Sequence, residues 1–328
     1  MPKSLTPKSL AVVAKAKPIQ SYERGQGFDL LRLGSRILYV SHTNSGPSYA
    51  DNAEFVFSSL TMKDKLVLDD ELVLKTTSVI TVLVRGDTIW ASCKQGDDEK
   101  QVVLVIAVSA AGKLRLKQTY PMPERGELAD AGAIVAIKCW RDPEALELYM
   151  PGNELEKIAT IPAWNPTGMR AATLHGSQLA LLGSNRAGVC VFDVSTPNEP
   201  KQTALIRGQM TGPSHIEWYD DGYVVAFGGV GDIYRAGAKG ALKRLGRIKT
   251  ANSPSSMLRV EDVCFLYNGS LLFMKNPDKD SRKVELLQLG DKPTMLPIMS
   301  LGMPVKGMAV TDSHLHVLGD DRIATFAL

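Results

Sequence analysis

Residues 171–183 read AATLHGSQLALLG: a short strand-like run, the turn Gly176-Ser177, and a second, strongly apolar run. Glycine, asparagine and aspartate tolerate the positive φ angles that two-residue hairpin turns require. The stretch therefore predicts a β-hairpin, and it decides the fold because the same pattern returns along the chain. The other copies are 29–40 (DLLRLGSRILYV), 81–92 (TVLVRGDTIWAS), 217–229 (EWYDDGYVVAFGG), 263–274 (VCFLYNGSLLFM) and 307–319 (GMAVTDSHLHVLG).

The spacing of these turns indicates the architecture. They begin at residues 34, 86, 176, 221, 268 and 312, and a degenerate copy at 133–150 has Arg141-Asp142-Pro143-Glu144 as its expected turn. Most spacings are close to the roughly 40–50 residues of a four-stranded propeller blade. The two extreme spacings, 55 and 35 residues, flank the degenerate copy. Together they span 90 residues, the length of two ordinary blades, so only the turn of the degenerate copy departs from the repeat.

We expect an all-β fold: a single β-propeller of seven four-stranded blades, with six as the alternative count. Further strand-like runs lie between the hairpins, at 54–57, 101–108, 189–194 and 283–289. A β-sandwich would also show alternating strands, but it does not predict one repeat length kept over six or seven copies. No segment keeps a 3.6-residue apolar period, so helix content should be near zero.

The last blade needs a strand from the beginning of the chain. After residues 307–319, only RIATFAL (322–328) remains, which leaves this blade with three strands. Residues 15–22 (KAKPIQSY) can supply the fourth, outer strand and cover two sheet edges. We therefore expect a flexible segment at residues 1–14 and one propeller domain at 15–328.

Composition favours a cytoplasmic protein without cofactors. The charge balance is +3, which by itself implies no nucleic-acid partner, and no apolar run reaches the roughly 18 residues of a membrane span. The N-terminal apolar run is too short for a signal peptide. Cys93, Cys139, Cys190 and Cys264 stand far apart in apolar segments, so we expect reduced core thiols.

No metal or catalytic motif stands out in the sequence. His314 and His316 share one face of a strand and could hold a metal, but no cysteine or carboxylate follows at ligand spacing. An ordinary blade position is the favoured interpretation. No GxSxG-type sequence places a nucleophile, so a hydrolase triad has no support.

Residues 188–200 (GVCVFDVSTPNEP) carry a family resemblance. The run Phe192-Asp193-Val194-Ser195-Thr196-Pro197, with Pro200, resembles the LVIVD repeat of bacterial β-propellers. One blade carries the motif well, and residues 104–118 repeat it without the aspartate or the prolines. The resemblance implies a bacterial-type, non-catalytic propeller. Its motif is structural, with prolines enforcing a rigid turn, so it implies no functional residues.

Loop lengths favour one rim of the propeller as the binding surface. Turns between first and second strands are minimal, whereas those between second and third strands are longer and polar, and such loops often carry binding residues. The alternative is that these loops are merely tolerated insertions. The candidate partner-binding residues on this top rim are Tyr49, Asp51, Asp97, Asp98, Trp164, Asn185 and Arg186.

Two further features have competing interpretations. Trp140 and Trp164 lie at strand ends; Trp140 stands beside Arg141, a pairing common at interfaces, but partial burial as a packing residue is favoured. Residues 235–249 hold six basic residues and no acid. That run could attract nucleic acid or an acidic protein. Few aromatic residues stand between the basic ones, however, so we favour a structural role in which the charges protect a sheet edge of blade five from pairing.

We therefore expect a non-enzymatic, monomeric propeller that binds another protein through its top rim, as an interaction scaffold or as a specific inhibitor or immunity-type partner. The alternatives are a propeller hydrolase or lyase with a site in the axial channel, and a small-molecule or glycan sensor. Neither alternative has a recognisable set of catalytic or ligand residues in the sequence.

Overall fold

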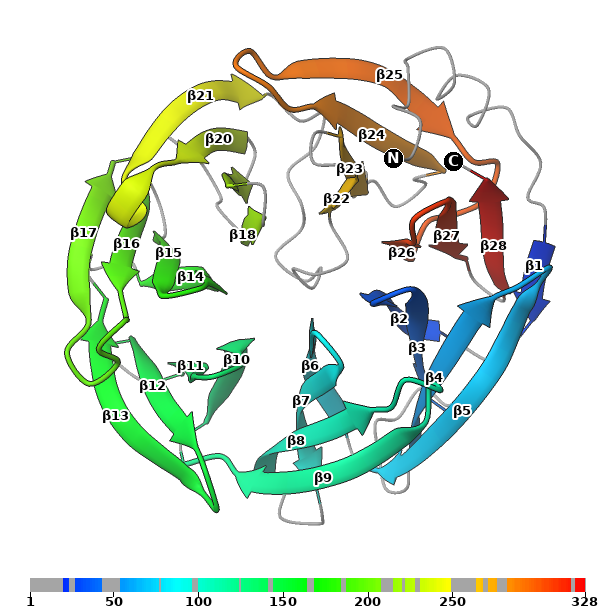
Figure 1. Ribbon diagram of the computed structural model, residues 1–328, viewed down its shortest axis with the longest axis horizontal. Coiled ribbons are helices and arrows are strands. Elements are labelled where there is room, and N and C mark those ends of the chain that lie inside the picture. The colour runs from blue at the N-terminus through cyan, green and yellow to red at the C-terminus, as the bar shows by residue number, and fades with distance from the viewer. Residues whose placement is uncertain are drawn as a thin grey trace. The chain divides into compact units, whose positions relative to one another are not determined.

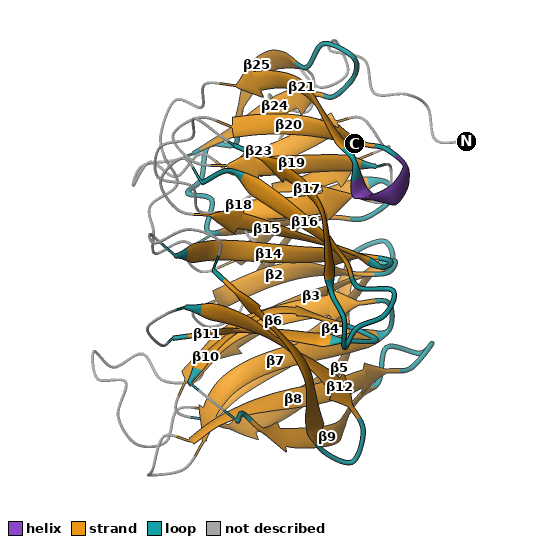
Figure 2. Cartoon of the chain, turned by 90° about the vertical axis from the view of Figure 1, so that its left-hand side faces the viewer, coloured by secondary structure: helices purple, strands orange, loops and turns teal. Residues whose placement is uncertain are grey.

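Strands carry most of the described residues of the computed structural model (Figure 2). Within that part of the chain the one helical element is a single 3₁₀ turn, η1 (Ala238–Gly240), so the expectation of almost no helix is confirmed there. No helix among these residues is long and apolar enough to cross a membrane. The structure describes residues 20–23, 27–42, 54–76, 78–95, 100–123, 125–140, 144–163, 168–183, 187–207, 215–219, 222–227, 231–248, 264–267, 271–275, 282–319 and 322–327.

The described strands form seven four-stranded sheets (Figure 1). In six of these sheets, neighbouring strands are also consecutive in the chain. The strand pairs with described register are antiparallel. Such sheets are the blades of a β-propeller, so the predicted fold class is confirmed. We number the blades in chain order.

The chain divides into two compact units. The first contains blades 1, 2 and 7 and nearly all of blade 6. Blade 1 is β2 (Gly27–Leu33), β3 (Arg36–His42), β4 (Glu54–Met62) and β5 (Leu66–Lys75); blade 2 is β6 (Ser78–Arg85), β7 (Thr88–Gln95), β8 (Lys100–Val108) and β9 (Leu114–Pro121). Blade 6 is β22 (Cys264–Tyr267), β23 (Leu271–Lys275), β24 (Lys283–Gln288) and β25 (Thr294–Ser300); blade 7 is β26 (Gly307–Val310), β27 (His314–Leu318), β28 (Arg322–Ala327) and β1 (Gln20–Glu23).

The second unit contains blades 3 to 5 and residues 289–294. Blade 3 is β10 (Gly126–Ala131), β11 (Val135–Cys139), β12 (Ala145–Pro151) and β13 (Leu155–Pro162). Blade 4 is β14 (Met169–His175), β15 (Gln178–Gly183), β16 (Val189–Asp193) and β17 (Lys201–Ile206). Blade 5 is β18 (His215–Tyr219), β19 (Tyr223–Phe227), β20 (Gly231–Ala236) and β21 (Leu242–Ile248).

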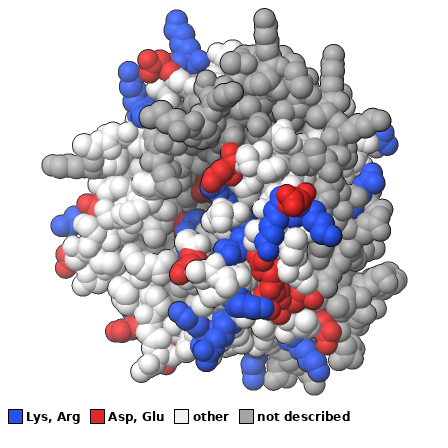
Figure 3. All heavy atoms as spheres, turned by 45° about the vertical axis from the view of Figure 1, so that its right-hand side comes forward, with Lys and Arg blue, Asp and Glu red and all other residues white. Residues whose placement is uncertain are grey.

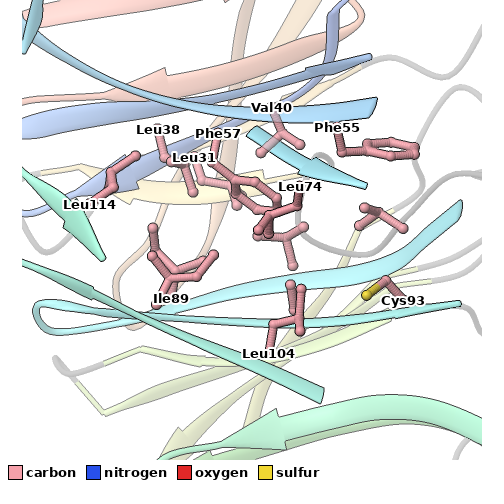
Figure 4. Packing of buried hydrophobic residues seen from close by; sticks show 14 of the residues in the cluster. Leu31, Leu38, Val40, Phe55, Phe57, Leu74, Ile89, Cys93, Leu104 and Leu114 are labelled. Atoms are coloured by element: carbon pink, nitrogen blue, oxygen red, sulfur yellow. The ribbon is translucent and has the colours of Figure 1, made fainter. Parts of the chain in front are cut away.

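Where the side chains are described, the blades bury both faces of their middle strands, which explains the continuous apolar runs of these strands. In β3 the side chains alternate: Leu38 and Val40 pack against blade 2, whereas Ile37 and Tyr39 pack against blade 7. Figure 4 shows the first of these cores, where Phe57 and Leu38 face Ile89 and Leu104. The second unit is built in the same way, with separate cores between blades 3 and 4 and between blades 4 and 5.

The hairpin turns are confirmed where they are described, and one predicted turn is wrong. Gly34, Gly86, Gly176 and Gly222 all have positive φ, as the turns require. In blade 3, however, residues 141–144 lie between β11 and β12, the second and third strands. The first hairpin of that blade turns at residues 132–134, where Gly132 donates its N–H to the Ile134 carbonyl. That position is 46 residues after Gly86 and 44 before Gly176, so the irregular spacing disappears.

The expected closing strand is also confirmed. β1 pairs with β28 in antiparallel register, from Gln20 opposite Thr325 to Glu23 opposite Arg322. It is the outer strand of blade 7, which otherwise has three strands. The remainder of the predicted strand, residues 15–19, and the predicted flexible segment, residues 1–14, lie outside the described residues.

Candidate functional site

The structure does not test the seven candidate partner-binding residues, because all of them lie outside the described residues. The flanking strands show where they belong in the chain: six fall between second and third strands, and Trp164 falls between blades 3 and 4. The seven are Tyr49, Asp51, Asp97, Asp98, Trp164, Asn185 and Arg186.

Trp140 is an aromatic residue of this rim that the structure describes. It follows β11 directly, in the connection between the second and third strands of blade 3, and 50% of its surface is exposed. Its backbone N–H donates to the Arg125 carbonyl at 2.9 Å, which fixes the main chain at this point. Sequence reasoning favoured a packing role for Trp140. The structure leaves half of this aromatic side chain buried and half exposed to solvent, on an anchored backbone.

Trp90 shows the opposite behaviour. It is buried in β7, among the apolar residues of that strand. Trp218 is also buried, and its ring stacks on the His175 ring at a centroid distance of 5.7 Å. Trp140 is thus the tryptophan of the described residues that is available to a partner.

A buried carboxylate joins the two outer strands of blade 3. Glu147 of β12 is 1% exposed; it accepts a hydrogen bond from the Tyr149 hydroxyl and pairs with Lys157 of β13 at 2.5 Å. Burying a charge is costly unless it is paired and hydrogen-bonded, and both conditions are met here. The carboxylate therefore holds β12 to β13.

Blade 5 repeats this arrangement. Asp232 of β20 is also 1% exposed, and its Oδ1 accepts hydrogen bonds from Arg244 Nη2 at 2.5 Å and from Arg247 Nε at 3.2 Å. A tyrosine again follows two residues later, and burial raises the pKa of the Tyr234 hydroxyl. Both blades thus place acid-x-Tyr on the third strand and cations on the fourth. Sequence reasoning missed this pattern, although an acid inside an apolar run (ELY at 147–149, DIY at 232–234) was a readable signal.

Buried polar side chains also connect neighbouring blades. Asp130 of β10 accepts a hydrogen bond from the Leu174 N–H of β14 at 2.6 Å, and Thr173 of β14 accepts one from the Trp218 N–H of β18 at 3.3 Å. Each of these hydrogen bonds joins the first strand of one blade to the first strand of the next, from blade 3 to blade 4 and from blade 4 to blade 5. Asp130 is therefore a structural acid as well.

In the first unit, acids and bases lie next to each other. Asp69 accepts hydrogen bonds from Arg36 at 2.9 Å and from the Thr61 hydroxyl, while Asp70 accepts one from the Leu114 N–H at 2.8 Å. Figure 3 shows acidic and basic side chains intermingled on the described surface that faces the viewer. The described part of that surface carries no large field of one sign.

The two histidines of β27 have a structural setting. His316 is fully buried; its Nε2 lies 3.3 Å from the Thr311 hydroxyl and its Nδ1 lies 3.0 Å from the Thr325 hydroxyl. Burial lowers its pKa to about 4, with the nearby charge of His314 as the second cause. Among the residues that the structure covers, no group of three His, Cys, Asp or Glu side chains could hold a metal ion.

The cysteine prediction holds for three of the four residues. Cys93, Cys139 and Cys190 are free thiols buried in strands. Burial raises the pKa of Cys93 to about 12 and that of Cys190 to about 11. The side chain of Cys264 lies outside the described part of the structure.

The motif that resembles the LVIVD repeat forms a tight turn after β16. Asp193 Oδ1 accepts a hydrogen bond from the Ser195 N–H at 2.8 Å, which lowers the pKa of the carboxyl, and Val194 donates its N–H to Ser177 at 2.7 Å. The aspartate therefore caps its own strand end. The sequence analysis assigned the rigid turn to the prolines, and the structure adds this hydrogen bond of Asp193.

Known structures share the fold. The chain is similar to the β-propeller domain of Cps50 (Swd1) from Myceliophthora thermophila, with a TM-score of 0.62, 10% identity, and coverage of 95% of this chain and 99% of that one. It is also similar to the periplasmic gluconolactonase PpgL of Pseudomonas aeruginosa (TM-score 0.57, 12% identity, 91% and 88% covered). A third similar structure is virginiamycin B lyase from Staphylococcus aureus (TM-score 0.58, 10% identity, 94% and 98% covered). No family profile and no curated relative matches the sequence. At these identities the likeness establishes the β-propeller fold alone.

Proposed function

We propose that this chain is a non-enzymatic β-propeller that binds another protein through the connections between the second and third strands of its blades. The observation that carries the proposal is Trp140, half exposed on a backbone anchored to Arg125. Tryptophan is enriched among the few residues that dominate binding energy at protein interfaces. Because its side chain loses little conformational freedom, an anchored tryptophan binds at low entropic cost.

The same role is proposed for the seven candidate residues of the top rim: Tyr49, Asp51, Asp97, Asp98, Trp164, Asn185 and Arg186. The protein would act as a monomeric cytoplasmic scaffold, or as a specific inhibitor or immunity-type partner. Kinship with the LVIVD-repeat propellers is part of this proposal, and the turn at Asp193 supports it.

The buried carboxylates support a non-enzymatic role. A general acid or base must reach the proton that it transfers. Asp130, Glu147 and Asp232 are each enclosed and each hold two strands together. These acids therefore serve the fold rather than a reaction.

The decisive experiment compares the proteins retained by immobilised wild-type and Trp140→Ala chains from a native lysate, by quantitative mass spectrometry. Removing a central aromatic anchor costs about 2 kcal/mol or more, so the specific partner should bind roughly thirtyfold more weakly. Met150→Ala is the matched control, because Met150 is 39% exposed and lies at the end of β12 away from the connection that carries Trp140. Retention of the same partner by Trp140→Ala at unchanged affinity would contradict the proposal.

A second control distinguishes the two rims. Ser35, Asp87 and Ser177 lie in the opposite turns, between first and second strands. Replacing them with alanine should leave partner binding unchanged. If these variants lose the partner while Trp140→Ala keeps it, the wrong rim has been chosen.

The alternatives are a hydrolase or lyase and a small-molecule or glycan sensor. The enzymatic alternative is favoured by the similarity in fold to a gluconolactonase and to a lyase. Turnover of a simple aldonolactone by the purified chain, measured as acid release at constant pH, would favour it over the binding role. Saturable binding of a free sugar without turnover would favour the sensor.

A further inference from the structure

The outer hairpin of blade 5 holds more positive charge than the hairpin itself can balance. Across β20, η1 and β21 (residues 231–248) there are five basic residues, and Asp232 is the one acid. Asp232 is buried, and its Oδ1 pairs with both Arg244 and Arg247. The hairpin therefore keeps a net charge of +4.

A β-bulge determines how the two arginines are presented. Residues three apart in a regular strand point to opposite faces of the sheet. In β21 the register shifts, so that Arg247 is opposite Asp232 and Arg244 is opposite Tyr234. The extra residue of the bulge lets both guanidinium groups reach the same carboxylate oxygen. The side chains of Arg244 and Arg247 remain 42% and 34% exposed, and the ion pair orients them.

On the other face of the hairpin, two cations stand opposite each other. Arg235 and Lys243 are directly paired across the strands, and both are exposed. Like charges in such a pair destabilise a sheet. The Arg235 guanidinium stacks over the Tyr223 ring at 4.4 Å, so it is fixed as well. A lysine at this edge discourages pairing with an uncharged or basic strand, but the same charge attracts an acidic one.

We propose that an acidic, extended segment of a partner protein docks along the outer edge of β21. β21 is the last strand of its sheet, and such an edge presents backbone donors and acceptors to an added strand. Lys243 and Arg244 are adjacent and so face opposite sides of the sheet, which places cations on both sides of that edge. This surface is separate from Trp140, so it does not depend on the function proposed above.

An acidic polypeptide fits this edge better than a nucleic acid does. Single strands are held by bases stacked on exposed aromatic rings between basic residues. Tyr234 is fully buried, and Arg235 covers one face of Tyr223. An acidic polypeptide needs no aromatic ring, because its carboxylates pair with the basic side chains and its backbone hydrogen-bonds to the edge of β21.

The test uses a fluorescent ten-residue peptide of alternating Glu and Thr, titrated with the full chain in 50 mM salt and followed by anisotropy. Lys243→Glu should weaken binding about fivefold to tenfold, because it removes an attractive charge and adds a repulsive one. The same variant places an opposite charge across from Arg235, so it should melt no lower than the wild type. Loss of binding could then not come from unfolding. Bound peptide should also slow hydrogen exchange in residues 242–248.

Lys117→Glu is the control, since Lys117 is an exposed lysine on β9, the outer strand of blade 2, and the change in net charge is identical. Unchanged binding by Lys117→Glu, with loss by Lys243→Glu, supports the proposal. Equal loss in both variants, or no saturable binding of the acidic peptide, overturns it. Tighter binding of a ten-residue thymidine strand, lost in Lys243→Glu, would overturn it in favour of a nucleic acid.

Discussion

Acid should weaken blade 7 through His316. The ring is fully buried between the hydroxyls of Thr311 and Thr325, and burial lowers its pKa to about 4. A neutral ring can donate to one threonine and accept from the other. Protonation removes the acceptor and places a charge in a site without a carboxylate among its hydrogen-bonding partners. The folded state therefore resists binding a proton that the unfolded chain binds readily.

The sign and size follow from proton linkage. The folded pKa of about 4 lies below the ordinary value of 6.5, so between these two pH values the unfolded chain holds more protons. The free energy of unfolding must then fall as the pH falls through this window. Each unit of pKa difference is worth about 1.4 kcal/mol. Protonation of His316 therefore lowers the free energy of unfolding by roughly 3 kcal/mol in full, and by about 2 kcal/mol between neutral pH and pH 5.

Urea unfolding at pH 7.5 and at pH 5 measures this loss. His316→Gln removes the titration while keeping one donor and one acceptor for the two threonines. The wild type should lose about 2 kcal/mol more than His316→Gln between the two pH values. His314→Gln, a change to the less buried neighbour, should behave almost as the wild type does. If wild type and His316→Gln lose equal stability on acidification, the argument from burial is wrong.

Three further predictions concern stability and reactivity. Deleting residues 1–23 removes β1 and exposes the edge of β28, so the melting temperature should fall by several degrees; an unchanged melting curve would refute the role of β1 in closing the blade. Gly240→Ala should lower the free energy of unfolding in urea more than Gly176→Ala does. Both glycines have positive φ, but only at Gly240 would the new Cβ lie 2.2 Å from the Gln178 side chain. Equal losses would show that this contact relaxes freely. A thiol reagent should label the buried cysteines slowly at pH 7.5 until the protein is unfolded, and rapid labelling of more than one in the native state would contradict their placement. These are Cys93, Cys139 and Cys190.

The sequence predicted the blades because each hairpin carries its own local signal. A glycine with positive φ between two apolar runs is required by the turn itself, as at Gly34 and Gly176. Blade 3 was misjudged because its first turn, at residues 132–134, is flanked by small alanines. The stronger turn signal, Pro143 with its polar neighbours, lies in the next connection, between β11 and β12. Local chemistry identifies a turn, but it does not say which turn of the blade it is.

The polar interior was harder to predict from the sequence. Asp232 and Glu147 stand among apolar residues, and only the register of the neighbouring strand brings Arg244 or Lys157 to them. Whether Trp140 is exposed likewise depends on packing that no pattern in the sequence encodes. Long-range pairings of this kind are consequences of the fold. Sequence periodicity alone does not contain them.

The pairing of β1 with β28 has a consequence for how the protein is made. The paired residues lie roughly 300 positions apart, from Gln20 to Thr325. At about 5–20 residues per second, a ribosome needs some tens of seconds to bring the second strand out after the first. Throughout that interval β1 has no partner and can pair with any exposed edge nearby. Blade 7 therefore cannot close during synthesis until β28 has left the ribosome.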